Sequence, residues 1–501
     1  MMAATVLLLL LLCRLAPAAV SVPPQPPVRC GRDGCVLSNA YGAWSSDRAD
    51  CRVAAVEYPA SERDMVAAVA RASAGGMRVK AVSGLAHNIP KMACPAGPGG
   101  DDSASLLIST KNYAGVEVDA AARTVTAESG ASLRAVIDTA EARGLSLPAS
   151  PYWDEMSVGG VLSTGPTAAP GGAGASPCMT TSWPSASSCP PERSKGGPGS
   201  CRSGKAMRSF PPRSSRLACL GSSPRDDCAI QDDFAEHAGR HEFADISWYP
   251  SQHQAMYRID DRAPLDATGD GVNDFIGFQP IPIAASSAIR ASETLLEKTR
   301  DVKGKCVMAA AGIAAKRLVG NGLRPGQRWK KKAPKSSGGV AYNGLLIRFM
   351  RRSEAWLGHP EDSVVVDFNY YRTADASSAR LSQDVWEEVE QMAFVKHGAR
   401  PHWAKNRMVA FRGVQGKYPG WGSFAAAKRE LDPRGLFDSP WSDAVIGSGG
   451  GGGVGADGCA LDGQCVCSED RHCSPAQGYY CRAGRVYTEA RVCRHFASNL
   501  A

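Results

Sequence analysis

The sequence predicts an α+β protein with two domains and a small disulfide-rich tail. Three observations predict this class. A strand, a helix and a second strand follow one another within about 30 residues after Cys51, as in a βαβ unit. Paired-strand patterns return between residues 243 and 258 and between residues 342 and 371. Six of the 17 cysteines lie between Cys459 and Cys493.

The first 21 residues predict a secretory signal peptide. The apolar run Val6–Leu12 is too short to span a bilayer, and the small residues Ala16, Pro17 and Ala18 follow it as a cleavage site. No later segment has the length and apolar composition of a transmembrane helix. We therefore expect an exported chain without a membrane span, in the extracellular space (apoplast) or the vacuole.

The formal net charge of +8 comes from two short basic segments. Residues 192–225 carry a net charge of +7 and residues 324–335 carry +6, which leaves −5 on the rest of the chain. Aromatic residues do not alternate with these basic residues, so we do not expect a nucleic-acid partner. No pattern in the sequence indicates an oligomeric state. At 501 residues, with 44% hydrophobic content, the chain is long enough for two or three globular domains.

The first domain is predicted from hydrophobic periodicity. Val53–Tyr58 and Met77–Ser83 are expected strands, and Ser61 is the expected N-cap of the helix between them. Further strands are expected at 106–110, 116–119 and 124–128. A second helix begins after Ser132, with one apolar face formed by Leu133, Val136, Ile137 and Ala140.

The nine residues Ser157–Gly165 are the most distinctive stretch of this domain. Gly159 and Gly160 are adjacent, and Ser163, Thr164 and Gly165 follow. Glycine lets main-chain N–H groups approach a ligand without an intervening side chain, so the stretch suits the phosphates and ring edge of a dinucleotide. An ordinary glycine-rich turn is the alternative interpretation.

Four segments of the first domain together resemble a known family. They are Ser83–Lys91, Glu128–Gly130, Gly144–Pro148 and Ser157–Gly160. The region 79–165 resembles the PCMH-type (vanillyl-alcohol-oxidase-type) FAD-binding domain, and more closely that of the plant L-gulono-1,4-lactone oxidase family. The resemblance implies FAD as the cofactor. It assigns cofactor binding to Ser83, Gly84, His87, Asn88, Gly130, Ser157, Gly159, Gly160, Thr164 and Gly165.

His87 occupies the position at which several relatives join a histidine covalently to the flavin methyl group. The loop around it carries only Gly84, where such relatives have several glycines. A hydrogen-bonded turn residue is the alternative role for His87.

The second half contains one string with chemical character, Pro401–Arg407. By the resemblance, His402 positions or deprotonates the substrate hydroxyl, Lys405 supplies positive charge near the reduced flavin, and Trp403 forms a packing wall. The alternative is a helix end with a hydrogen-bonded histidine and a solvated lysine. No metal-ligand cluster competes with this assignment, so no metal is expected.

The resemblance implies an FAD-dependent oxidase that converts L-gulono-1,4-lactone and O₂ to L-ascorbate and H₂O₂. The alternatives are another secreted FAD-linked carbohydrate or alcohol oxidase, and an inactive secreted relative that cannot hold FAD. The expected partners are thus a sugar lactone and O₂. Expected domains are an FAD-binding domain at 50–231, a D-arabinono/L-gulono-lactone oxidase-type substrate domain at 232–445, a glycine-rich linker at 446–457 and a cysteine-rich tail at 458–501.

Two segments depart from the family pattern. Residues 166–225 lose hydrophobic periodicity, and their composition is typical of disorder. Read one nucleotide earlier, codons for Cys178–Thr181 permit Val-His-Asp-Tyr, as the family shows after its Gly-Gly turn. We therefore hypothesise that 166–225 is translated out of frame. Between residues 307 and 339 the pattern also fails, which indicates missing sequence or a solvated surface loop.

The cysteines of the tail predict a disulfide-stapled module. Their connectivity cannot be read from spacing, and a zinc site is the less favoured alternative, because paired Cys-x-x-Cys spacing is absent. Cys30 and Cys35 are expected to form a further disulfide near the N-terminus.

Overall fold

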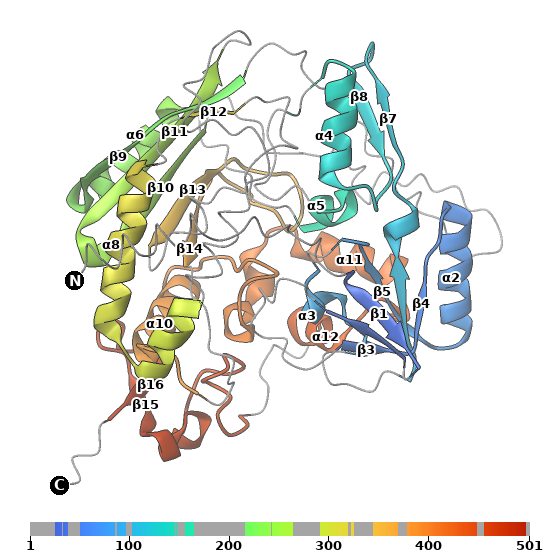
Figure 1. Ribbon diagram of the computed structural model, residues 1–501. Coiled ribbons are helices and arrows are strands. Elements are labelled where there is room, and N and C mark those ends of the chain that lie inside the picture. Colours follow the sequence, from blue (N-terminus) through green and yellow to red (C-terminus); the bar gives the residue numbers. More distant parts are fainter. Residues whose placement is uncertain are drawn as a thin grey trace.

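The computed structural model confirms an α+β architecture with a disulfide-rich C-terminal region. The N-terminal elements and the six-stranded sheet lie on opposite sides of the molecule, with the C-terminal helices and tail along its lower side in the view of Figure 1. The structure describes residues 26–32, 34–38, 51–85, 88–96, 103–145, 147, 156–164, 216–241, 243–263, 291–318, 322–324, 344–368, 378–447 and 455–496.

A three-stranded parallel sheet forms the centre of the first domain. Its order is β4 (Ala55–Glu57), β6 (Ser105–Ser109) and β5 (Arg78–Val82), so the predicted βαβ unit is confirmed, with β6 inserted between its two strands. Helix α2 (Glu62–Ala74) begins after Ser61, whose Oγ accepts the Asp64 N–H. The helix buries Ala68 and Ala72 against β5 and β6.

Two disulfides lie in and beside an N-terminal antiparallel sheet. Strands β1 (Val28–Gly31), β2 (Gly34–Leu37) and β3 (Cys51–Val53) form an antiparallel sheet. The predicted Cys30–Cys35 disulfide is confirmed, and Cys51 is joined to Cys94 after the short helix α3 (Pro90–Ala93).

The antiparallel pair β7 (Val116–Asp119) and β8 (Thr124–Ala127) packs under helix α4 (Leu133–Ala142). Ser132 accepts the Ala135 N–H as the N-cap, as predicted. The buried face of the helix is the predicted one, Leu133, Val136, Ile137 and Ala140.

The second domain is built on a six-stranded antiparallel sheet. Its strands, in spatial order, are β12 (Gly322–Arg324), β9 (Arg216–Asp226), β11 (Gln254–Ala263), β10 (Phe243–Tyr249), β13 (Leu345–Met350) and β14 (Ser363–Phe368). Helix α6 (Ile230–Arg240) packs on it through Phe234, and a helix over 291–299 precedes α8 (Val302–Leu318). Arg300, with φ of 57°, separates these last two helices.

The two segments that depart from the family pattern are more regular than the sequence predicts. Strand β9 occupies the end of 166–225, where composition predicts disorder, because backbone pairing with β11 and β12 satisfies its polar groups regardless of periodicity. Helix α8 and strand β12 likewise continue beyond Val307. Residues 165–215 and 325–343 lie outside the described residues.

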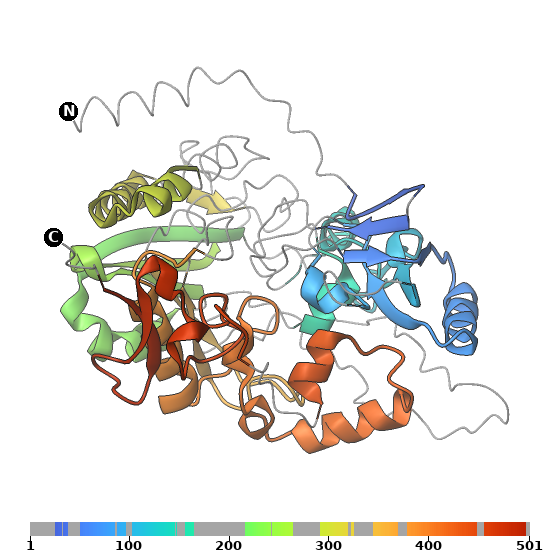
Figure 2. The ribbon, with the colours of Figure 1, turned by 90° about the horizontal axis from the view of Figure 1, so that it is seen from below.

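The C-terminal helices return to the first domain. After α10 (Gln383–Gln391), the chain forms α11 (Trp421–Leu431) and α12 (Pro440–Ile446), which lie near α3 and β5 in Figure 1 and below the N-terminal elements in Figure 2. The Val79 N–H donates to Leu436 O at 2.8 Å, and Lys80 Nζ donates to Phe437 O at 2.6 Å. The first domain is therefore completed by residues more than 350 positions later.

The tail is a disulfide-bonded module, as predicted. The hairpin β15 (Tyr479–Ala483) and β16 (Arg491–His495) lies against α10. The connectivity that spacing could not give is Cys459–Cys465, Cys467–Cys481 and Cys473–Cys493. No helix in the described ranges is long and apolar enough to cross a membrane.

Candidate functional site

The predicted cofactor-binding glycines gather where the parallel strands end. Thr110, directly after β6, donates to Val82 O at 3.3 Å, and Gly130 N–H donates to Tyr113 O at 2.9 Å. Gly159 N–H then donates to Ser129 O at 2.8 Å. The main chain near 84, 110, 130 and 159 thus forms one continuous edge at the carboxyl ends of β5 and β6, the edge at which parallel sheets bind ligands.

Residues 157–164 do not form the glycine-rich turn of the alternative interpretation. Val158–Thr164 is the short helix α5, because the residues before it are held by an isolated bridge between Ser132 and Ser157. Its first amides are used within the protein: Val158 N–H donates to Ala131 O at 2.8 Å and Gly160 N–H to Ser157 Oγ at 3.2 Å.

The glycines of this edge meet different surroundings. A Cβ at Gly130 would overlap Thr110 O and lie 2.5 Å from Tyr113 O, and one at Gly84 would lie 2.7 Å from Lys111 Cβ. Glycine is therefore required there by the packing of the protein itself. A Cβ at Gly160 would meet only Ser157 Oγ, at 3.1 Å, and Gly160 is exposed.

This edge fits a flavin dinucleotide. It lies at the carboxyl ends of β5 and β6, and at Gly160 main chain faces outward without a side chain. Ser83 lies on it, with its Oγ accepting Leu85 N–H at 3.3 Å, and Asn88 is buried with its amide donating to Leu85 O. His87 and Gly165 lie outside the described residues, as does the side chain of Thr164.

The two halves of the candidate site meet at Lys91 and Asn406. Lys91, buried on α3 three residues after Asn88, donates from Nζ to Asn406 O at 2.8 Å. Asn406 Oδ1 in turn accepts the His402 N–H at 2.7 Å. We define residues 402–406 as the active-site string. One lysine thus fixes the string against the cofactor-side loop.

His402 is held in a defined tautomer. Its Nδ1 accepts the backbone N–H groups of Ala404 at 3.1 Å and Lys405 at 3.3 Å, so we assign its proton to Nε2. Burial, with the neighbouring Lys405 charge, lowers the pKa of His402 to about 3. A neutral imidazole with Nε2–H can donate to a substrate hydroxyl. The geometry therefore favours the positioning role over the base role for His402.

Lys405 ends a row of alternating charges that crosses the sheet. Arg258 on β11 pairs with Asp245 on β10 at 2.5 Å, and Asp245 lies opposite Arg348 on β13. Arg348 pairs with Asp367 on β14, and Lys405 Nζ lies 3.4 Å from Asp367 Oδ1. We call these five residues the charge row. Its formal sum is +1, and Lys405, 44% exposed, is its open end.

Asp367 and Arg348 were missed by sequence reasoning. Burial alone would raise the pKa of the Asp367 carboxyl, but Lys405 and Arg348 lower it below its ordinary value. Each of the two residues is the one charged residue in an otherwise largely apolar strand, Leu345–Met350 or Ser363–Phe368, and this pattern could have identified them. Charged residues within such strands are paired when they are buried.

Trp403 belongs to an aromatic core. Its ring stacks on Tyr418, with centroids 5.5 Å apart, and contacts Phe411 and Trp441. Trp403 therefore anchors the string through packing, and its role as a wall beside the substrate stays a prediction.

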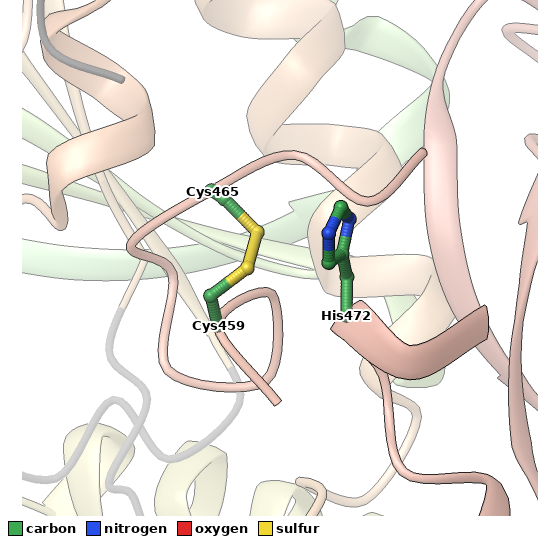
Figure 3. Close-up of side chains that lie close together, drawn as sticks. All are labelled: Cys459, Cys465 and His472. Carbon is green, nitrogen blue, oxygen red and sulfur yellow. A yellow bond between two sulfur atoms is a disulfide. The ribbon is translucent and has the colours of Figure 1, made fainter. Parts of the chain in front are cut away.

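The zinc alternative for the tail is not supported. Cys459, Cys465 and His472 lie close enough for a metal site, and Figure 3 shows the imidazole facing the two sulfurs. These sulfurs are joined to each other, as are those of the other tail cysteines in pairs, and zinc binds the thiolate form.

Three family models match the chain. Residues 53–175 match the FAD binding domain, residues 344–445 match D-arabinono-1,4-lactone oxidase, and residues 456–495 match the C-terminal domain of L-gulonolactone oxidase 2-like proteins. The cofactor is therefore FAD, and the tail is a domain of its own within this family.

The chain is similar to curated relatives over almost its whole length. It is 40% identical to L-gulonolactone oxidase 3 and 33% identical to L-gulonolactone oxidase 5, both of Arabidopsis thaliana. These alignments cover 95% and 98% of the chain and 94% and 97% of the relatives. The first runs over 578 positions, more than the 501 residues of the chain, so this chain lacks residues that the relative carries.

Solved structures agree on the fold. Cholesterol oxidase from B. sterolicum matches with a TM-score of 0.56 at 14% identity, over 85% of this chain and 100% of that one. A solvent-stable cholesterol oxidase matches with a TM-score of 0.52, also at 14% identity, over 86% and 99%. With two full-length relatives above 30% identity, an FAD-binding domain and a lactone-oxidase domain, this chain belongs to the plant L-gulonolactone oxidase family.

Proposed function

We propose that the chain oxidises L-gulono-1,4-lactone with FAD and O₂, giving L-ascorbate and H₂O₂. Two electrons and two protons leave a carbinol of the lactone, and O₂ takes up both to become H₂O₂. The observation that carries the proposal is the meeting of Lys91 and Asn406, because it sets the active-site string against the edge that fits FAD. Relatives named L-gulonolactone oxidase support the choice of lactone.

The residues of the string have distinct tasks in this proposal. His402, neutral and protonated on Nε2, donates to the substrate hydroxyl and orients its carbinol. Lys405, at the end of the charge row, offers positive charge where negative charge develops. FAD, when bound, supplies the acceptor for the two electrons. Gly160 and Ser157 would lie beside it, with Ser83, Gly84 and Asn88 on the neighbouring loop and Gly159 and Gly130 as packing glycines.

The test is performed on the purified full-length chain. We expect absorbance near 450 nm, and turnover of L-gulono-1,4-lactone with O₂ consumption and matching H₂O₂. A panel of other aldonolactones, sugars and alcohols separates this proposal from another FAD-linked carbohydrate or alcohol oxidase. Colour that remains with acid-precipitated protein would place the flavin on His87 covalently.

The variant Lys405→Met is the control, and we expect it to keep the colour and lose most of the turnover. A coloured protein that turns over another substrate in preference would replace the lactone assignment. A colourless protein would support the alternative of an inactive relative that cannot hold FAD. The residues that this chain lacks would then explain the loss of FAD binding.

We propose further that the chain enters the secretory pathway and ends in the apoplast or the vacuole. Five disulfides among the described residues support an oxidising compartment. A fluorescent fusion that keeps Val6–Leu12 should leave the cytosol, and deletion of residues 1–21 should retain it there. Cytosolic fluorescence of the intact fusion would contradict the proposal.

A further inference from the structure

The cysteine-rich tail touches the chain directly after the active-site string. Val409 N–H donates to Gly463 O at 3.1 Å. Gly463 has φ of 70°, and a Cβ there would lie 2.6 Å from three atoms of the Arg407 side chain. The absence of a side chain at Gly463 thus lets Arg407, two residues after Lys405, lie flat against the tail.

Arg407 is also held by helix α10. It pairs with Glu390, and both side chains are largely buried. The same helix binds the tail through hydrogen bonds. Glu387 accepts Cys493 N–H at 2.6 Å, and Glu388 accepts the N–H groups of Arg485, Val486 and Tyr487. The tail, α10 and the residues after the string therefore form one interlocked unit.

The disulfide Cys459–Cys465 fixes the part of the tail that meets Arg407. It closes a loop of seven residues that contains Gly463. Inside the loop, Gly463 N–H donates to Ala460 O at 3.0 Å and Gln464 N–H to Cys459 O at 2.9 Å. Ala460 N–H donates to the carbonyl of His472, whose ring packs beside the disulfide (Figure 3). The Gly463 carbonyl is therefore presented in one orientation.

We propose that the tail is the positioning element of the active-site string, acting from Gly463 through Arg407 and Val409. Lys91 holds the last residue of the string, Asn406, from the cofactor side, and the tail holds Arg407 and Val409, which follow directly after it. Small displacements of reacting groups cost large factors in rate, so loosening the anchored segment directly after Lys405 has a direct effect on turnover. The effect on turnover rests on the proposed function, whereas the anchoring is measurable without it.

The first test compares two small disulfides. The double variant Cys459→Ala/Cys465→Ala opens the loop next to Arg407, and Cys30→Ala/Cys35→Ala opens a loop of similar length in the N-terminal hairpin. Hydrogen–deuterium exchange over residues 402–411 is the readout. We expect about tenfold faster exchange there in the first variant and unchanged exchange in the second. Equal exchange over 402–411 in both variants would overturn the proposal.

The second test compares two glycines with the same backbone conformation. Gly463→Ala and Gly458→Ala each place a side chain at φ near 70°, but a Cβ at Gly458 meets only Cys473 O, at 3.8 Å. We expect kcat for the lactone to fall about tenfold in Gly463→Ala alone, with bound FAD unchanged in both variants. A wild-type kcat in Gly463→Ala would overturn the proposal. A wild type that turns over no lactone would contradict the proposed function, and the exchange comparison would still decide the anchoring.

Discussion

Lys91 Nζ donates to the backbone carbonyl of Asn406 at 2.8 Å, across 315 positions of sequence. This bond joins helix α3 to the string that carries His402 and Lys405. The lysine is buried, and its ammonium group is stabilised by this acceptor and by the face of the Phe411 ring, 6.0 Å away. This bond thus connects the two halves of the site directly at the string.

Lys91→Met should lower both stability and activity. Loss of a charged hydrogen bond costs about 1.5–3 kcal/mol in the free energy of unfolding, and the freed string should lower kcat/KM. Lys80→Met is the matched control, since Lys80 Nζ also donates to a distant carbonyl, that of Phe437, at 2.6 Å. It should cost stability and leave kcat/KM unchanged. Urea unfolding and steady-state kinetics measure the two effects, and an unchanged kcat/KM in Lys91→Met would contradict the assigned role.

Asp367→Asn should destabilise the second domain by about 3 kcal/mol, because it removes the carboxylate that Arg348 pairs with on β14 from a largely buried pair. The matched control is Asp362→Asn: this aspartate is 63% exposed and pairs with Arg351 at 3.6 Å, so its loss should cost less than about 1 kcal/mol. Chemical unfolding compares the two variants. Equal losses would show that the charge row contributes no more than a surface pair.

The pH dependence of Asp367→Asn has a defined sign. The pKa of Asp367 is lowered in the folded state, so its contribution is present above the ordinary aspartate pKa and is lost as pH falls through the folded pKa. The difference in stability between wild type and Asp367→Asn should therefore shrink in acid. A difference that stays constant down to about pH 2 would contradict this assignment.

His402 should stay neutral in the native protein between about pH 5 and pH 8, because burial lowers its pKa to about 3. The ¹³C chemical shifts of the imidazole, assigned with His402→Asn, should be those of the Nε2–H tautomer throughout. In urea the same signal should titrate near pH 6.5. Stability should consequently fall as pH drops from about 6.5 towards 3, because only the unfolded chain gains the proton. A native midpoint near 6.5 would restore the base role.

The two kinds of glycine on the cofactor edge should respond in opposite ways. Gly130→Ala forces a Cβ onto Thr110 O and should abolish folding or cost more than about 3 kcal/mol. Gly160→Ala lies on the exposed side of α5, where its Cβ meets only the Ser157 hydroxyl, at 3.1 Å, and once that hydroxyl shifts slightly the FAD-free protein should be more stable by up to about 0.5–1 kcal/mol. If FAD lies against Gly160, the same variant should bind FAD more weakly. Unchanged FAD affinity, measured by flavin fluorescence, would remove Gly160 from the site.

The sequence predicted best what local pattern decides. The face of α4 was predicted residue by residue, because Leu133, Val136, Ile137 and Ala140 recur at helical spacing after a capping serine. For Ser157–Gly165 the sequence predicted close approach to a ligand, or else a glycine-rich turn, whereas contacts with residues 129–132 hold Val158–Thr164 as helix α5. Propensity could not anticipate those contacts.

The site was predictable as residue types and not as an arrangement. His402 and Lys405 stand out in the sequence. Asp367, in contrast, becomes a partner of Arg348 only through the register of β13 and β14, and of Lys405 only where the string lies beside β14. Lys91 lies within the segment Ser83–Lys91 that resembles the family, but the sequence predicts no role for it. Its acceptor is a backbone carbonyl, which no side-chain pattern encodes. The bond between Val409 and Gly463 joins two backbone groups, so it could not be predicted from a side-chain pattern either.

Glu387 and Glu388 are neighbours on α10 that should give opposite dependences of stability on pH. Burial raises the pKa of Glu387 to about 7, against the opposing effect of Arg407. The folded state then binds its proton more tightly than the unfolded chain does, so this residue lowers stability as pH rises from about 4.5 to 7. For Glu388, burial is outweighed by three backbone N–H groups of the tail, and its pKa is lowered. Its contribution is present above the ordinary pKa and is lost in acid.

Unfolding of Glu387→Gln and Glu388→Gln, measured from pH 4 to pH 8, separates these signs. Relative to wild type, the stability of Glu387→Gln should increase progressively as pH rises towards 7. The stability of Glu388→Gln relative to wild type should decrease as pH rises over the lower part of the range. The variant lacks the ionised carboxylate that accepts the N–H groups of Arg485, Val486 and Tyr487. Parallel curves would mean that the tail does not dock on α10 through these two carboxylates. Curves that diverge as described would show that tail docking is strongest when Glu388 is ionised and Glu387 is protonated.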